Sequence, residues 1–246
     1  MVIWWRDLDG VATYTQFGVD VLRAANFTGN IKVFPHGIDT KTFYPVKKEV
    51  ARKSILASLP EDAFIVLNAN RNQPRKQIDL TIKAFAKFAT DKDNVWLYLH
   101  MGAKDVGWDV IPLFEKEMRK LGNPVDRLIM TSSSPNISSV SEEQLNFIYN
   151  CADVCLNTSQ GEGFSLTNAE ASVCGIPQIV PNHSACKELW GQNRGLLINV
   201  AEYTTDKDLF LERAIVSTEN IVKSLNSMYN SVEARKKLGN KARSYF

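Results

Sequence analysis

Residues 157–181, NTSQGEGFSLTNAEASVCGIPQIVP, decide how the rest of the chain is organised. The pattern predicts a strand end, a loop broken by two glycines, a helix from Ser165 and a second buried strand. The first N–H groups of a helix lack partners within it and favour an anion. Glu162 in the loop and Glu170 on the second helical turn are placed to accept hydrogen bonds from hydroxyl groups. The stretch therefore predicts a phosphate and a polyol bound side by side.

The same stretch resembles the E-x7-E signature of the retaining glycosyltransferases of group 1, or family 4, which have the GT-B fold. Residues 162–177 read EGFSLTNAEASVCGIP, with G-F before the helix and C-G-x-P after it. Ser165 stands where the family commonly has Gly, and Thr167 where it commonly has Pro. The alternative interpretation is a helix N-terminus carrying two solvated glutamates.

Composition and charge set broad limits on function. The chain has 246 residues and a formal net charge of +2, which suits one large domain or one domain with a fragment of another. The near-neutral balance gives no argument for nucleic acid as a partner. No apolar run approaches the roughly 18 residues of a membrane-spanning helix, and we expect a cytoplasmic protein.

The cysteine, histidine and aspartate patterns predict no metal site. The four cysteines lie in apolar or helix-like contexts outside any C-x-x-C pair, which is typical of reduced thiols. His183 and Cys186 have a loose H-x-x-C spacing without a second ligand pair. Asp7-Leu8-Asp9 is a D-x-D, but no pattern of the metal-dependent glycosyltransferase fold follows it. We expect neither a metal nor another cofactor.

Apolar runs and helical patterns alternate from Phe64 onward. Strands are predicted at 64–68, 95–101, 127–131, 152–156, 178–180 and 195–198. Helical patterns are predicted at 78–89, at 112–121, after the capping-box residues Ser141 and Gln144, and at 221–229 and 231–244. Alternating strands and helices imply an α/β fold with a parallel sheet covered on both faces. Right-handed crossovers make this sheet doubly wound and Rossmann-like.

A basic loop, NANRNQPRKQ at 68–77, follows the first predicted strand. It should meet the glycine-broken loop, because the carboxyl ends of parallel strands share one sheet edge. Arg71 and Lys76 resemble the arginine and lysine of the family's G-R-L-x-x-x-K-G, which hold the donor's diphosphate, and Arg75 stands where an acid is frequent. A guanidinium can bind two phosphate oxygens, whereas an ammonium acts as a point charge. The alternative is a solvated basic turn.

The resemblance implies a role for each candidate site residue. The predicted catalytic residues are Arg71, Lys76 and Glu162. The two cations would stabilise the departing diphosphate, and Glu162 would bind hydroxyls of the donor sugar. The predicted donor-binding residues are Gly163, Phe164, Ser165, Glu170, Arg75 and Thr131. Glu170 would bind the ribose hydroxyls, and Thr131 would lie near the nucleobase.

The predicted function is retaining transfer of a hexose from a nucleotide-diphosphate sugar to an unknown acceptor. The variant N-R-N-x-x-R-K-x-x-D-L at 70–80 resembles GDP-sugar members, virus-encoded ones included, and favours GDP-mannose over a UDP-sugar. Three alternatives stay open: a non-catalytic nucleotide-sugar-binding module, a sugar-nucleotide epimerase of the GT-B fold, and a Rossmann oxidoreductase. The last lacks a G-x-G-x-x-G opening a helix.

The resemblance also implies a domain division. Residues 1–35 are interpreted as the tail of an N-terminal domain with its linker, and 36–246 as the donor-binding domain, the C-terminal half of the GT-B fold. The remainder of that N-terminal domain is the expected partner, and it would supply any peripheral membrane contact. We expect residues 1–246 alone to bind a nucleotide sugar but barely to transfer it.

Overall fold

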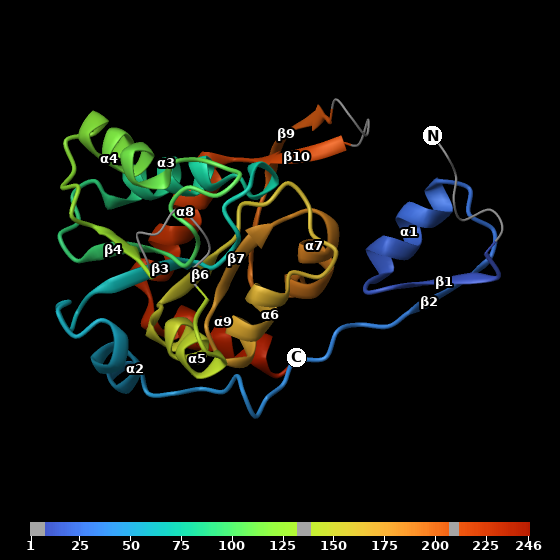
Figure 1. Cartoon of the computed structure of the whole chain (residues 1–246), viewed down its shortest axis with the longest axis horizontal. Coiled ribbons are helices and arrows are strands. Elements are labelled where there is room, and N and C mark those ends of the chain that lie inside the picture. Colours follow the sequence, from blue (N-terminus) through green and yellow to red (C-terminus); the bar gives the residue numbers. More distant parts are fainter. Residues whose placement is uncertain (1–7, 132–138, 207–211) are drawn as a thin grey trace.

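The centre of the molecule is a parallel sheet (Figure 1). The computed structural model describes residues 8–131, 139–206 and 212–246. Within these ranges, six strands pair in the order β5-β4-β3-β6-β7-β8, and every pair is parallel. They are β3 (Phe64–Asn68), β4 (Val95–Leu99), β5 (Leu128–Met130), β6 (Val154–Leu156), β7 (Gln178–Pro181) and β8 (Leu196–Ile198). The strand order reverses direction between β3 and β6, which confirms the predicted doubly wound fold.

Helices cover both faces of this sheet. Successive side chains of a strand point to opposite faces, so one strand contributes to two hydrophobic clusters. Phe64 and Val66 of β3 pack into one hydrophobic cluster, whereas Ile65 and Leu67 pack into another. The first cluster includes α3 (Ile78–Ala89), α4 (Val110–Lys120) and α8 (Thr218–Asn230). The second includes α2 (Lys48–Ile55), α5 (Glu142–Cys151) and α6 (Leu166–Val173). The sheet is therefore buried on both sides, as the continuous apolar runs predict.

Local signals in the sequence are confirmed at several helix ends. Ser141 and Gln144 form the predicted capping box at the start of α5. Gly122 follows α4 with φ of +73°, a left-handed conformation that suits glycine. The last two predicted helices are α8 and α9 (Val232–Arg243).

Three segments form elements that the sequence pattern did not predict: helix α2, helix α7 (Ser184–Trp190) and the antiparallel pair β9 (Val200–Thr205) and β10 (Glu212–Val216). Half of the α2 residues are charged, and α7 begins at Ser184 with φ of +52° and has no side-chain cap. Strand β9 is almost wholly exposed, so its sequence carries no alternation between buried and exposed residues.

A smaller unit made of β1 (Gly10–Thr13), α1 (Gln16–Ala24) and β2 (Asn30–Val33) lies beside α7. Its two strands pair in parallel, and an extended segment joins them to α2 (Figure 1). The Glu188 carboxylate of α7 accepts hydrogen bonds from the backbone N–H groups of Gln16 and Phe17, at 2.9 and 2.8 Å. A carboxylate at the first turn of a helix is stabilised by the helix dipole. This contact fixes the small unit against the larger one.

Candidate functional site

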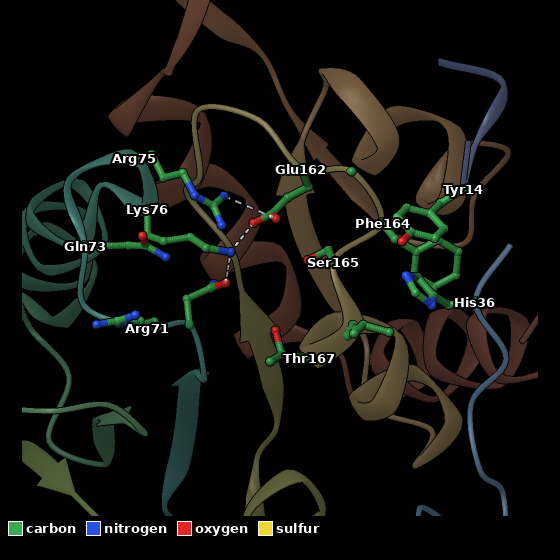
Figure 2. A pocket seen from close by; sticks show the side chains of 13 residues that line it. Tyr14, His36, Arg71, Gln73, Arg75, Lys76, Glu162, Phe164, Ser165 and Thr167 are labelled. Carbon is green, nitrogen blue, oxygen red and sulfur yellow. Dashed lines mark hydrogen bonds and ion pairs between the residues drawn. The ribbon is translucent and has the colours of Figure 1, made fainter. Parts of the chain in front are cut away.

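A cavity of about 360 Å³ lies where the loops after β3 and β6 meet (Figure 2). The basic loop forms one side of it, and the glycine-broken loop with the start of α6 forms the other. Seven of the predicted site residues line it: Arg71, Arg75, Lys76, Glu162, Gly163, Phe164 and Ser165. Figure 2 shows Lys76 and Glu162 pointing toward each other across the cavity. The structure thus brings together cations and an acid that are 86 residues apart in the chain.

Lys76 and Glu162 form a buried ion pair, and both residues are at least nine-tenths buried. The Lys76 ammonium also donates to Asn70 Oδ1 at 2.7 Å. Burial lowers the pKa of Lys76, although Glu162 opposes this shift. Burial alone would raise the pKa of Glu162, but the charges of Lys76 and Arg75 outweigh it and hold the pKa below its usual value. Each charge therefore favours the ionised form of the other.

A polar network fixes the turn that carries Lys76. One turn of 3₁₀ helix, η1 (Pro74–Lys76), ends at Gln77 in a left-handed conformation with φ of 49°. The Thr158 hydroxyl lies 2.9 Å from the carbonyl oxygens of Lys76 and Gln77. It also lies 2.8 Å from the Thr81 hydroxyl, which accepts a hydrogen bond from Asn68 at 2.9 Å. Thr158 therefore joins the end of β6 to the turn that carries Lys76.

Thr158→Val is expected to destabilise the fold by about 1–3 kcal/mol, because it keeps the shape and leaves buried carbonyls without their donor. The measurement is the free energy of unfolding in urea. Thr204→Val, at an exposed position of β9, is the matched control and should change this free energy by less than about 0.5 kcal/mol. Equal effects of the two variants would contradict the structural role of Thr158.

The two arginines of the basic loop have different partners. Arg71 forms a two-point ion pair with Asp105, with Nε–Oδ2 and Nη2–Oδ1 distances of 2.6 and 3.1 Å. Arg75 donates to the Gly161 carbonyl at 3.1 Å and lies 3.5 Å from a Glu162 oxygen. Both side chains are about half exposed. They can therefore reorient toward an anion in the cavity at small cost.

The start of α6 differs by one residue from the predicted start. Helix α6 begins at Leu166, and Ser165 precedes it with φ of +71°. This left-handed conformation is easier for glycine, the residue expected here from the resemblance. The Ser165 hydroxyl donates to Asn168 Oδ1 at 2.8 Å and does not cap the helix. In the described part of the chain no side chain caps the first N–H groups of α6, and residues 165–167 line the cavity.

Two predicted site residues lie outside this cavity. Glu170, one turn further along α6, accepts a hydrogen bond from the Tyr149 hydroxyl at 2.5 Å. Burial raises the pKa of Glu170. Thr131 follows β5, and its hydroxyl lies 2.7 Å from His100 Nδ1 and 3.1 Å from the Tyr98 hydroxyl. Thr131 lines a separate cavity of about 210 Å³.

Several residues at the site were not predicted to have a role there. Tyr14 and His36 stack with ring centroids 4.0 Å apart, and His36 meets Phe164 edge-on at 5.2 Å. Both rings line the cavity opposite Lys76 (Figure 2). Asn70 was given no role from the sequence, yet its side-chain oxygen accepts a hydrogen bond from the Lys76 ammonium. No local pattern marks Tyr14, because its contact depends on how the small unit packs.

Metal-binding groups do not gather in the described ranges, where no cluster of three His, Cys, Asp or Glu side chains could hold an ion. Asp7 lies outside the described residues, so the D-x-D stretch is not described as a whole. All four cysteines are buried and free. Among the described residues, no helix has the length and apolar character needed to cross a bilayer.

The sequence matches a known family over most of its length. Residues 52–245 match the family model described as glycosyl transferases group 1. Mannosylfructose-phosphate synthase of Agrobacterium fabrum is 27% identical over 184 residues, a match covering 74% of this chain and 39% of the relative. The chain therefore spans less than half the length of this curated relative.

Solved structures of GT-B glycosyltransferases share the fold. Sucrose-phosphate synthase from Thermosynechococcus elongatus superposes with a TM-score of 0.76 at 23% identity, over 96% of this chain and 53% of that protein. The C-terminal domain of a glycosyl transferase group 1 family protein from Francisella tularensis superposes with a TM-score of 0.67 at 17% identity. That match covers 85% of this chain and 96% of the domain. At these identities the matches establish the fold.

Proposed function

The chain belongs to the group 1 glycosyl transferases, and on that premise we propose that it binds the donor of a retaining hexosyl transfer, a nucleotide-diphosphate sugar. One observation carries this proposal. Lys76, Arg71, Arg75 and the uncapped start of α6 converge on one cavity with the carboxylate of Glu162. Cations and helix N–H groups suit a diphosphate, whereas a carboxylate suits sugar hydroxyls.

The chemistry follows from this arrangement. The bond between the anomeric carbon and the phosphate oxygen breaks, a bond to the acceptor oxygen forms, and the acceptor's proton passes to the departing phosphate. Lys76, the arginines and the α6 N-terminus would stabilise the negative charge of that diphosphate. Arg71 would exchange Asp105 for phosphate oxygens. Glu162 and the backbone near Gly163 and Phe164 would orient the sugar.

The nucleoside would extend along α6. Glu170 lies one turn beyond the cavity, and we propose that it binds the ribose hydroxyls, with the base toward Thr131. We also propose that residues 36–246 form the donor-binding domain and that 1–35 belong to a preceding domain. The match of this chain to an isolated C-terminal domain of the family supports that division.

Calorimetric titration of GDP, UDP and ADP into the chain tests the proposal directly. We propose GDP-mannose as the donor, with a UDP-sugar as the competing choice. The stretch 70–80 and the mannosyl group in the name of the Agrobacterium relative support this preference. GDP should therefore bind more tightly than UDP. Tighter UDP binding would move the assignment to a UDP-sugar, and no binding of any nucleotide would contradict the function.

Donor binding is expected to survive chelation of divalent cations. The reason is that Lys76 and the two arginines already offer positive charge at the proposed diphosphate position. The dissociation constant of GDP should change by less than about twofold when EDTA replaces magnesium, a change of under about 0.5 kcal/mol. Complete loss of affinity in EDTA is the opposite result, and it would place a metal ion at the site.

A second candidate function is that residues 1–246 alone bind a nucleotide sugar but do not transfer its sugar. The observation that favours it is that the chain spans only 39% of the curated relative's length. Loss of acceptor positioning can cost about 7–11 kcal/mol of barrier height. Release of free mannose and formation of a transfer product, measured on one sample with GDP-mannose, separate the two functions.

A further inference from the structure

Glu162 is placed to compete with a phosphate for the ammonium group of Lys76. We propose that the Lys76–Glu162 ion pair makes the site select an intact nucleotide sugar over a bare nucleoside diphosphate. This inference rests on the proposed function and concerns the selectivity of the same site. It assigns Glu162 a second task, that of counter-ion to Lys76 until a phosphate group takes its place.

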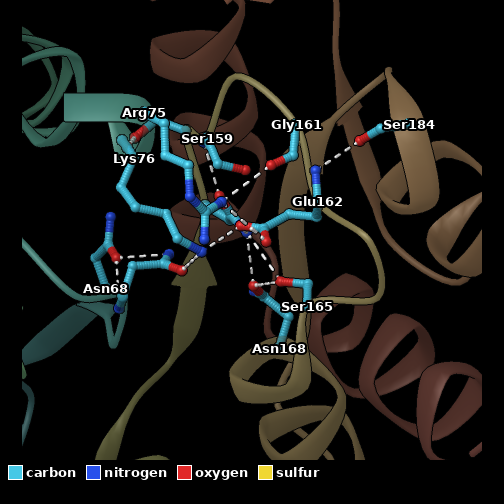
Figure 3. A network of polar contacts seen from close by, with 12 residues as sticks. Asn68, Arg75, Lys76, Ser159, Gly161, Glu162, Ser165, Asn168 and Ser184 are labelled. Carbon is cyan, nitrogen blue, oxygen red and sulfur yellow. Dashed lines mark hydrogen bonds and ion pairs between the residues drawn. The ribbon is translucent and has the colours of Figure 1, made fainter. Parts of the chain in front are cut away.

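The polar contacts of the pair support this role (Figure 3). One Glu162 oxygen contacts Lys76 and lies 3.4 Å from the Asn157 amide nitrogen, and the other lies 3.5 Å from Arg75. The carboxylate therefore offsets the charges of two cations. A diphosphate has to separate Lys76 from Glu162 before it can take the lysine as its own partner.

Three hydrogen bonds hold the backbone at and next to Glu162. Its N–H donates to the Ser184 hydroxyl at 3.0 Å, and its carbonyl accepts from the Ala185 N–H at 3.3 Å. Two residues earlier, the Gln160 N–H donates to the Arg75 carbonyl at 2.8 Å, which ties the two loops together. The carboxylate consequently stays beside the phosphate position when its ion pair opens.

Bare and sugar-bearing ligands then differ in what they offer Glu162. A nucleoside diphosphate brings negative charge next to a buried carboxylate and gives it no donor. A buried charge that loses its partner is strongly unfavourable. A nucleotide sugar places hydroxyl donors at the carboxylate and replaces the lost contact with Lys76. A ligand shifts such an equilibrium only through its differential interactions, and here the sugar hydroxyls supply the difference.

The test compares wild type with Glu162→Gln, using inorganic pyrophosphate, GDP and GDP-mannose in calorimetric titrations. Glutamine keeps the shape and removes the competing charge. Pyrophosphate and GDP should bind at least about fivefold more tightly, the lower end of usual coupling between two sites. The affinity for GDP-mannose should rise less than the affinity for GDP, so the ratio of the two affinities should fall in Glu162→Gln. Unchanged or weaker pyrophosphate binding in Glu162→Gln overturns the inference.

A double-mutant cycle separates competition for Lys76 from simple repulsion. In a Lys76→Met background, Glu162→Gln can relieve repulsion but has no lysine to release. Its effect on pyrophosphate affinity should therefore be smaller than in wild type. An equal gain in both backgrounds would show that the ion pair plays no part in selectivity.

Glu115→Gln is the matched control, since it removes a carboxylate that pairs with Arg119 on α4 and does not line the cavity. Its pyrophosphate affinity should match that of wild type.

If circular dichroism shows that Glu162→Gln does not fold, Glu162→Asp takes its place. The shorter side chain reaches Lys76 less well, so this variant should also bind pyrophosphate more tightly than wild type. If the chain binds a nucleotide sugar but the Glu162 variant has the same pyrophosphate affinity as wild type, this inference is refuted and the proposed function is not. Tighter pyrophosphate binding without any nucleotide binding refutes the proposed function instead.

Discussion

Asp153→Ala is expected to lower the free energy of unfolding by about 3–5 kcal/mol, the usual cost of breaking a buried ion pair from one side. Asp153 is buried and precedes β6. One of its oxygens accepts from Lys48 at 2.5 Å, and the other accepts from Arg52 and from the Ile65 backbone N–H, each at 2.8 Å. Alanine would leave two cations and a buried N–H group without their acceptor.

The measurement is guanidinium unfolding followed by circular dichroism, with Asp126→Ala as the control. Asp126 also pairs with an arginine, but its side chain is 81% exposed, so its loss should change stability by less than about 0.5 kcal/mol. The midpoint should fall for Asp153→Ala while the slope stays constant. A loss no larger than that of Asp126→Ala would mean that Asp153 does not hold α2 against the sheet.

The parallel sheet could be predicted because a strand that is buried on both faces is a continuous apolar run in the sequence. Strand β3 is buried at every position, and its predicted bounds are those observed. The other five strands of the sheet differ from the predicted ranges by at most two residues at either end. Strands covered on both faces are continuous apolar runs, which stand out between polar turns. The pair β9–β10 has no continuous buried run, since β9 is almost wholly exposed and only part of β10 is buried, and it was missed.

The candidate site was predictable only in part, for a different reason. The two loops could be assigned to one sheet edge from topology alone. Which side chains pair there depends on rotamers and packing, which no local pattern encodes. Neither Lys76–Glu162 nor Arg71–Asp105 was predicted, since the partners are 86 and 34 residues apart.

The backbone conformation of single residues was a further source of difference between the predicted and the observed structure. Ser165 looked like the first residue of a helix, as a serine before an apolar run often is. Its φ of +71° places it outside the helix, and its hydroxyl binds the Asn168 side chain. A serine there gives no sign in the sequence that the backbone is left-handed. The shift matters for the site, because it leaves the first N–H groups of α6 without a side-chain cap.

Lys76→Met should weaken nucleoside diphosphate binding by about 1.5–3 kcal/mol, the range for hydrogen bonds to charged groups. Methionine fills the space of the lysine stem but carries no charge, and Glu162 then faces the phosphate with Arg75 as its neighbouring cation. The affinity for GDP should fall roughly 10- to 150-fold. Guanosine, which has no phosphate, should bind both proteins equally well.

The matched control for Lys76→Met is Lys83→Met. Lys83 pairs with Asp79 one turn away on α3, its side chain is 42% exposed, and it does not line the cavity. Its removal should leave GDP and guanosine affinities unchanged, which separates a local phosphate contact from a general loss of positive charge. If Lys76→Met weakens guanosine as much as GDP, the lysine does not bind the diphosphate. In that case Lys76 belongs to a structural turn, and the anion site must be sought at Arg71 or at the start of α6.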